Sequence, residues 1–174
     1  LWASLMEMAK IGATPKGGCN RQALTDEDKV GRDLFIRWCT EIGCNVTVDA
    51  IGNIFAQRRG SDINAPPILT GSHLDTQPTG GKFDGVYGVL AGLEVLRTLD
   101  EKGIVTRSPI EVAVWTNEEG SRFAPALIGS GVWCGNFDLE QTYAITDKSG
   151  KTLGSELERI GYKGKYPAVP RKLK

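Results

Sequence analysis

Residues 66–76 read Pro-Pro-Ile-Leu-Thr-Gly-Ser-His-Leu-Asp-Thr and are the most informative part of the chain about its fold. The short apolar run after the two prolines predicts a buried strand, and its polar end predicts a loop. A helical pattern follows over 85–99, and a second apolar strand is predicted over 110–115. This order of strand, helix and strand predicts an α/β fold, a three-layer αβα sandwich with a mostly parallel central sheet.

The predicted helix over 85–99 carries Gly88 and Gly92 four residues apart, so its backbone can approach a sheet closely. The patterns on either side predict these further elements: a helix over 1–11, a helix from Thr25 to Gly43, paired strands over 46–48 and 53–58, and short helices over 124–133 and 152–160. Neither an internal repeat nor a linker divides the chain, so these elements are predicted to belong to one domain.

The composition is typical of a globular protein, with 40% hydrophobic and 24% charged residues among 174. Lys+Arg and Asp+Glu both number 21, and this zero net charge gives no reason to expect nucleic acid or an anionic membrane as a partner. The longest apolar run, over 86–93, includes two glycines and is far shorter than the roughly 20 residues that span a bilayer. We therefore expect neither nucleic acid nor a membrane as a partner.

The chain has four cysteines, Cys19, Cys39, Cys44 and Cys134, and none of them forms a Cys-x-x-Cys pair. Their spacing matches neither a zinc knuckle nor a disulfide framework, so we expect reduced, partly buried thiols. Reduced thiols favour a reducing compartment, and hence a cytoplasmic location. The single histidine, His73, excludes a three-histidine zinc site within this chain.

Two carboxylates near the first strand and the helix could serve a metal site. His73 and Asp75 point to the same side of an extended segment, and a carboxylate at that spacing can orient a metal-bound imidazole. Asp84 directly precedes the predicted helix over 85–99, where it is either a simple N-cap or a carboxylate that bridges two metal ions. A histidine near a strand end is also compatible with a purely structural role.

Glu118 and Glu119 follow the predicted strand over 110–115. Adjacent acids at a strand end can form a solvated turn, but they can also supply one metal ligand and one general base. With His73, Asp75 and Asp84 they predict a partly imidazole, acidic site at one edge of the sheet, suited to a pair of divalent ions. The chain contains no phosphate-binding loop, no dinucleotide fingerprint and no Gly-x-Ser-x-Gly motif that would predict another chemistry.

Three segments carry a specific resemblance to a known family. They are Gly-Ser-His-Leu-Asp-Thr-Gln-Pro over 71–78, Gly-Lys-Phe-Asp-Gly-Val-Tyr-Gly-Val-Leu-Ala-Gly-Leu-Glu-Val-Leu over 81–96, and Asn-Glu-Glu-Gly-Ser-Arg-Phe over 117–123. In order and spacing they resemble the hydantoinase/carbamoylase amidohydrolases, which include N-carbamoyl-L-amino-acid hydrolases and β-ureidopropionases. The resemblance implies the fold of the di-zinc exopeptidases and covers nearly the whole chain.

The resemblance implies a role for each candidate residue. His73 would ligate the first metal ion with Asp75 orienting it, Asp84 would bridge both ions, and Glu119 would ligate the second ion. Glu118 would be the general base that deprotonates the attacking water and then protonates the leaving nitrogen. The cofactors would be two divalent ions, with zinc favoured and manganese, cobalt or nickel as alternatives, and they would be weakly bound or absent in this chain.

The implied reaction hydrolyses a linear C–N amide bond. It removes the carbamoyl group of N-carbamoyl-β-alanine or N-carbamoyl-L-α-amino acids and yields the amino acid, ammonia and carbon dioxide. The pair Gln77-Pro78 resembles the β-ureidopropionase-like members more than the allantoate amidohydrolases, which favours these substrates. Gln77 is a candidate substrate-binding residue. The alternatives are an allantoate amidohydrolase, or an aminoacylase or exopeptidase of the same fold.

The chain departs from the family pattern because it has no further histidine to complete either ligand set. We therefore expect residues 1–174 to be the N-terminal part of the metal-binding catalytic domain. The lid and dimerisation domain and the rest of the catalytic domain would be absent, and the full-length protein would be a homodimer through that lid. We expect the isolated chain to be inactive, and the alternative of another class is a non-catalytic fragment with a defective metal site.

Overall fold

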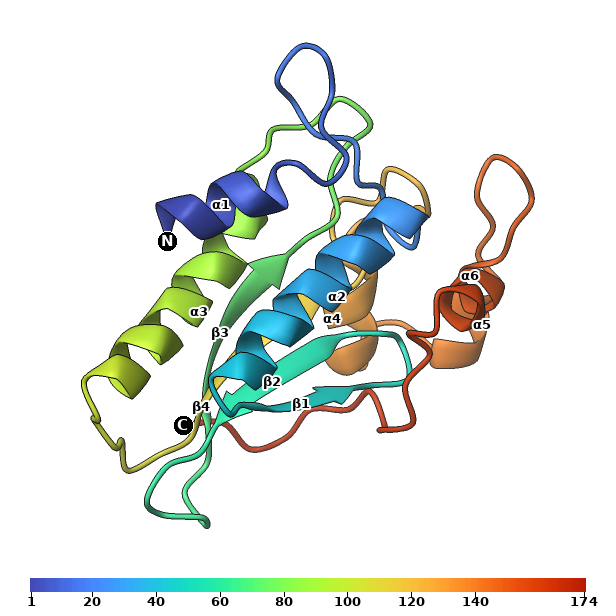
Figure 1. The fold of residues 1–174 in the computed structure, drawn as a ribbon. Coiled ribbons are helices and arrows are strands. Elements are labelled where there is room, and N and C mark those ends of the chain that lie inside the picture. The colour runs from blue at the N-terminus through green and yellow to red at the C-terminus, as the bar shows by residue number, and fades with distance from the viewer.

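The computed structural model describes residues 1–174, which form a four-stranded sheet with helices packed on it (Figure 1). The elements in chain order are α1 (Trp2–Met8), α2 (Asp26–Glu41), β1 (Asn45–Val48), β2 (Ile54–Arg58), β3 (Ile68–His73), α3 (Val86–Glu101), β4 (Ile110–Trp115), α4 (Ile128–Trp133), α5 (Leu139–Tyr143) and α6 (Leu153–Arg159). The α/β class predicted from the sequence is confirmed.

The predicted strand–helix–strand unit is present as β3, α3 and β4. β3 is an edge strand and is exposed along much of its length, so the prediction that it is buried is wrong. The two strands pair in parallel, with His73 opposite Trp115 at their carboxyl ends. α3 connects them and packs on both. A Cβ atom at Gly92 would lie 2.9 Å from the Val112 Cγ2 atom, so the glycine permits the close approach of helix and sheet that its position predicted.

The sheet is mixed, and the expectation of a mostly parallel sheet is wrong for these strands. The strand order is β1-β2-β4-β3, and both the β1/β2 and the β2/β4 pairs are antiparallel. The physical reason is the connection between β1 and β2, which spans residues 49–53 only. A parallel pair needs a crossover of a dozen or more residues, so this short turn makes a hairpin.

The two faces of the sheet are covered unequally. One face carries α1, α2 and α3, whose buried side chains belong to a cluster of 27 residues that also includes residues of α4 and α6. A second cluster has only three residues: Phe55, Ala113 and Trp133. Trp133 of α4 packs near Trp115, with ring centroids 5.5 Å apart, and Arg171 lies over the Phe55 ring. The predicted third layer is therefore represented here by α4 and the C-terminal segment.

The helix boundaries follow local capping chemistry. The Thr25 side chain accepts a hydrogen bond from the Asp28 N–H at the start of α2, as the sequence predicted. α4 begins later than predicted because Leu127 has a φ of +62°, which is outside helical geometry. α5 was not predicted. It is five residues long, and its only local signal is Asp138, which accepts from the Gln141 N–H.

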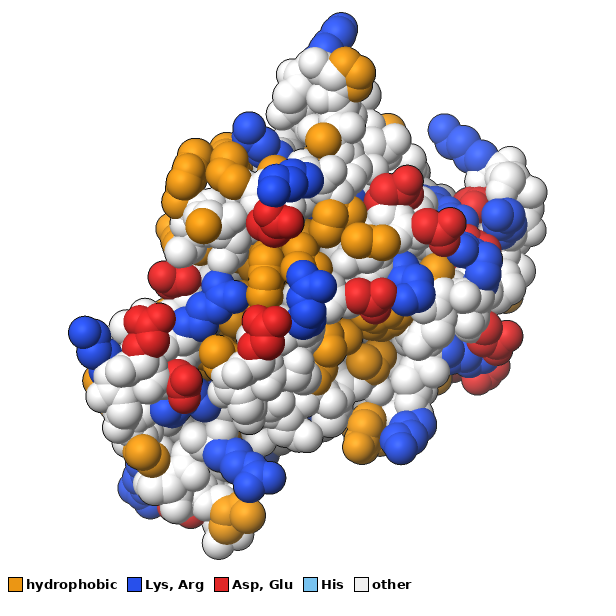
Figure 2. Space-filling model, in the orientation of Figure 1, with side chains coloured by type: hydrophobic (Ala, Val, Ile, Leu, Met, Phe, Trp, Pro, Cys, Tyr) orange, Lys and Arg blue, Asp and Glu red, His pale blue; other side chains and the backbone are white.

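The surface in the orientation of Figure 1 carries Lys and Arg side chains interspersed with Asp and Glu, without a broad area of one sign (Figure 2). This distribution matches the zero net charge of the sequence. No helix in the structure combines the length and apolarity needed to cross a bilayer. All four cysteines are free thiols, and three of them are buried.

Candidate functional site

The site predicted from the sequence lies where β3 and β4 end side by side. His73 is the last residue of β3, Asp84 lies two residues before α3, and Glu118 follows β4. The structure brings these three side chains together: His73 Nε2 is 3.1 Å from a Glu118 carboxylate oxygen and 3.8 Å from an Asp84 carboxylate oxygen. The carboxyl ends of parallel strands thus form the predicted acidic and imidazole edge.

The orientation of the His73 ring defines which nitrogen is available for chemistry. Nδ1 lies 2.8 Å from the main-chain carbonyl oxygen of Asp75. A carbonyl can only accept, so this contact places the proton on Nδ1 and leaves the Nε2 lone pair facing Glu118 and Asp84. Nε2 is therefore the ring nitrogen that is available for chemistry at the site.

Asp75 orients the His73 ring through its main-chain carbonyl and not through its carboxylate, which is the group that the resemblance implies. Its carboxylate is 3.9 Å from His73 Nδ1, so the contact that orients the ring comes from its main-chain carbonyl. The carboxylate oxygens accept hydrogen bonds from the main-chain N–H groups of Glu118 (3.2 Å) and Glu119 (3.1 Å). Burial, with repulsion from the nearby Asp28, raises the pKa of Asp75. Asp75 therefore connects the end of β3 to the segment that carries both glutamates.

Asp84 is not the N-cap of α3, so that structural alternative is wrong. The N-cap residue is Gly85, with a φ of +67°, and α3 has no side-chain cap. The Asp84 side chain is 72% exposed, which leaves its carboxylate free to bind at the mouth of the site. A Cβ atom at Gly85 would lie 2.4 Å from the His73 ring, so a side chain there has no room.

Glu119 lies apart from the His73, Asp84 and Glu118 group. Its carboxylate accepts a hydrogen bond of 2.6 Å from Gln77 Nε2, the candidate substrate-binding side chain. The predicted ligands are thus divided into a His73–Asp84 pair and a separate Glu119.

The donor chemistry suits divalent cations, since imidazole nitrogen and carboxylate oxygen are common ligands of zinc and manganese. The number of donors falls short, because no group of three or more His, Cys, Asp or Glu residues in the structure is arranged to hold a metal ion. The chain supplies part of a donor set and does not build a complete metal centre from its own residues.

The segment over 117–123, which carries Glu118 and Glu119, is held by contacts along its length. Asn117 has a φ of +51° and is fully buried, and its side-chain amide donates to the Phe123 carbonyl. The Glu118 carbonyl accepts from Leu127 N–H at the start of α4. Sequence reasoning identified the two glutamates but missed Asn117, whose buried, left-handed geometry has no signal in a single sequence beyond the tolerance of asparagine for it.

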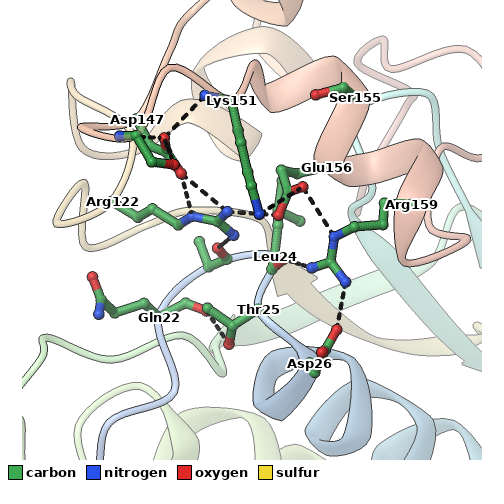
Figure 3. Close-up of polar contacts among 12 residues, drawn as sticks. Gln22, Leu24, Thr25, Asp26, Arg122, Asp147, Lys151, Ser155, Glu156 and Arg159 are labelled. Atoms are coloured by element: carbon green, nitrogen blue, oxygen red, sulfur yellow. Dashed lines mark hydrogen bonds and ion pairs between the residues drawn. The ribbon is translucent and has the colours of Figure 1, made fainter.

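An ionic cluster lies beside this segment (Figure 3). We define it by its six charged residues: Asp26, Arg122, Asp147, Lys151, Glu156 and Arg159. Arg122 pairs with Glu156 at 2.6 Å and with Asp147 at 3.1 Å, and Arg159 pairs with both Glu156 and Asp26. The cluster connects the segment after Glu119 with α6 and with the start of α2.

The stability of the chain should decrease at acidic pH, because Asp147 then becomes protonated. Burial alone would raise the pKa of this carboxyl, but hydrogen bonds from Ser149, Lys151 and Arg122 lower it to about 2. A pKa below the unfolded value of 3.8 means that the ionised form stabilises the fold. That contribution is complete above about pH 5 and is lost as the pH falls from about 4 to about 2.

We expect Asp147→Asn to lower the free energy of unfolding by about 1–2 kcal/mol at pH 7 and by much less at pH 2. Urea denaturation of both proteins across this pH range measures the effect. Asp100→Asn is the control, because this aspartate is exposed on α3 and lies outside the ionic cluster. An equal loss at pH 7 and pH 2 would assign the effect to packing and not to the charge.

The fold and the site together define an α/β chain with a histidine and carboxylates at the carboxyl ends of parallel strands. Residues 69–163 match the peptidase family M20/M25/M40, and the chain belongs to this family.

Similarity to individual known proteins places the chain more specifically within this family. The chain is 57% identical to an N-carbamoyl-L-amino-acid amidohydrolase of Rhizobium meliloti over 99% of its length, which is 42% of that protein. A hydantoinase/carbamoylase family amidase of Burkholderia multivorans is 62% identical and superposes with a TM-score of 0.97, again over 99% of this chain and 42% of the other. A ureidoglycolate hydrolase of Oryza sativa is 32% identical over 90% of the chain and 33% of its own length. The resemblance to hydantoinase/carbamoylase enzymes is confirmed, and the chain spans 42% of the first two of these proteins.

Proposed function

We propose that the protein containing this chain is a metal-dependent amidohydrolase that removes the carbamoyl group of N-carbamoyl-L-amino acids. The observation that supports it most is the group formed by His73, Asp84 and Glu118 at the carboxyl ends of β3 and β4. The 57% identity to an N-carbamoyl-L-amino-acid amidohydrolase supports the choice of substrate class over a peptide substrate.

In this proposal the residues of the chain have separate roles as metal ligands and as a substrate contact. His73, Asp84 and Glu119 are ligands for two divalent cations, zinc being favoured over manganese, cobalt and nickel, and segments outside this chain complete the set. Such cations, when bound, polarise the carbamoyl oxygen and make water more acidic. Gln77 remains a candidate contact to the substrate, next to Glu119.

Glu118 is the proposed general base. Its side chain is 30% exposed, so water and substrate can reach it, and its main-chain N–H is fixed by Asp75. Glu118 takes a proton from the water that attacks the carbamoyl carbon. The bond from that carbon to the amino-acid nitrogen breaks, Glu118 returns the proton to this nitrogen, and the released carbamic acid decomposes to ammonia and carbon dioxide.

Within this substrate class, N-carbamoyl-β-alanine is the second candidate, favoured by the Gln77-Pro78 pair of the sequence. The 32% identity to a ureidoglycolate hydrolase favours testing ureido acids too. A homodimer through segments outside this chain, and a cytoplasmic location, also stay predictions.

The isolated 174-residue chain should show negligible hydrolysis, whereas the protein made from the complete coding sequence should be active. The physical reason is that the chain offers only part of each ligand set. Ammonia release is measured for both proteins with N-carbamoyl-L- and D-amino acids, N-carbamoyl-β-alanine and allantoate, with and without a chelator. Release of the free amino acid is measured in the same way with an N-acetyl amino acid and a dipeptide. Chelator-sensitive turnover by the isolated chain contradicts this prediction, and activity on the dipeptide alone overturns the proposed function.

A further inference from the structure

Arg122 lies three residues after Glu119, and its side chain, only 12% exposed, extends into the ionic cluster. Every edge of its guanidinium group has a partner. Nε donates to Asp147 (3.1 Å), Nη2 donates to Glu156 (2.6 Å) and Nη1 donates to the main-chain carbonyl of Ala23 (2.9 Å). The guanidinium carbon also lies 4.9 Å from the centroid of the neighbouring Phe123 ring.

The partners of Arg122 come from two regions that are distant in sequence. Ala23 precedes α2, whereas Asp147 lies between α5 and α6 and Glu156 lies on α6. A guanidinium group bound on three sides has one orientation, because its donors are arranged in a rigid plane. Arg122 therefore fixes the end of the 117–123 segment to two parts of the structure that do not otherwise contribute to the site.

The other end of the same segment is fixed by Asp75, which accepts the N–H groups of Glu118 and Glu119. Gly120 lies between these two points and has a φ of +67°. Because it has no side chain, it makes no side-chain contact that could hold the backbone there. Asp75 and the Leu127 N–H hold the Glu118 backbone directly, and Arg122 fixes the other end of the segment that carries Glu118.

We propose that Arg122 is a positioning residue of the hydrolytic site, which keeps Glu118 in place by fixing the end of the 117–123 segment. The proposal rests on the proposed function, in which Glu118 moves the proton. Proton transfer requires the base within hydrogen-bond reach of the water, and a displacement of about 1 Å can reduce the rate ~10²-fold. Loss of the Arg122 contacts should therefore lower kcat more than it raises KM.

Arg159 provides a matched control within the same cluster. It also binds Glu156, and it contacts Asp26 and the Leu24 carbonyl, but it makes no contact with the 117–123 segment. Arg159→Met thus removes a guanidinium from the cluster without releasing the glutamates. A purely structural role for Arg122 predicts similar kinetics for Arg122→Met and Arg159→Met.

The test compares Arg122→Met, Arg122→Lys and Arg159→Met in the protein made from the complete coding sequence. We expect Arg122→Met to lower kcat by ~10- to 10²-fold with metal content retained and KM changed less than about threefold. Arg122→Lys should recover part of kcat, because one ammonium can keep one or two of the three contacts. Arg159→Met should stay within about threefold of the original kcat. Equal kcat values for Arg122→Met and Arg159→Met overturn the proposal.

A second readout does not depend on activity. Amide hydrogen exchange at Glu118 and Glu119, whose N–H groups bind Asp75, should be faster in Arg122→Met than in Arg159→Met. If the unmodified protein hydrolyses no carbamoyl substrate, the proposed function fails, and the exchange rates still decide whether Arg122 fixes the segment. If Arg122→Met does not fold, Arg122→Lys is compared with Arg159→Met by the same two measurements, and unchanged exchange overturns the proposal.

Discussion

Glu118→Gln in the protein made from the complete coding sequence should lower kcat by at least ~10²-fold and leave the metal content unchanged. Glutamine has nearly the shape of glutamate, and the backbone at this position is held by Asp75 and by Leu127, so the side chain should keep its place. What the amide lacks is a basic oxygen that can accept a proton from water. Steady-state hydrolysis of an N-carbamoyl-L-amino acid, with metal analysis of the same samples, measures both quantities.

Glu119→Gln is the matched comparison, because it makes the same chemical change at the neighbouring position. It should reduce metal content, since the proposed role of Glu119 is that of a ligand and not of a base. Glu118→Gln should therefore lose activity and keep its metal, whereas Glu119→Gln should lose metal. Activity retained in Glu118→Gln removes Glu118 from the role of base, and metal lost from Glu118→Gln assigns it to the ligand set.

Gly85→Ala should both destabilise the fold and disturb the site. A Cβ atom here would lie 2.4 Å from Cε1 and Nδ1 of His73, and the backbone has the left-handed φ of +67°. The strained backbone and the overpacked contact should together lower the free energy of unfolding by about 2–3 kcal/mol. The ring would have to move away from Gly85 and so change its position relative to Glu118 and Asp84, and metal affinity should fall in the protein made from the complete coding sequence. Urea denaturation and metal titration measure the two effects.

Gly81→Ala is the control for this substitution. Gly81 lies in the loop that precedes Asp84, and a Cβ atom there would meet nothing within 4 Å. We expect its stability to change by less than about 0.5 kcal/mol, with metal affinity unchanged. If Gly85→Ala behaves like Gly81→Ala, the start of α3 can shift at little cost, and the contact between Gly85 and His73 is not what positions the ring.

The strand–helix–strand unit could be predicted because its periodicity is local. The apolar runs of β3 and β4 and the apolar face of α3 are each visible within about 15 residues. The order of the strands could not be predicted in the same way, because pairing depends on contacts between distant segments. The short turn after β1 predicted a hairpin, but nothing in β2 indicates that it also pairs antiparallel to β4.

The composition of the candidate site was largely predictable, and its geometry was not. Residue types identified His73, Asp84 and Glu118, which the structure brings together. They could not show that Gly85 and not Asp84 caps α3, because that depends on a backbone angle. They could not assign Arg122 either, since its carboxylate partners follow it by 25 and 34 residues on segments without a motif of their own.

The parallel pair of β3 and β4 has a consequence for the order in which the site forms during folding. All five predicted catalytic and metal-binding residues lie between positions 73 and 119, within this unit and its flanks. Contacts of short sequence separation close with a small loss of chain entropy, which favours early gathering of these side chains. The contact of Arg122 with Ala23 spans 99 residues, more than twice the 43 residues between Asp75 and Glu118, so it closes a larger loop. Folding thus favours bringing the site residues together before the contact between Arg122 and Ala23 forms.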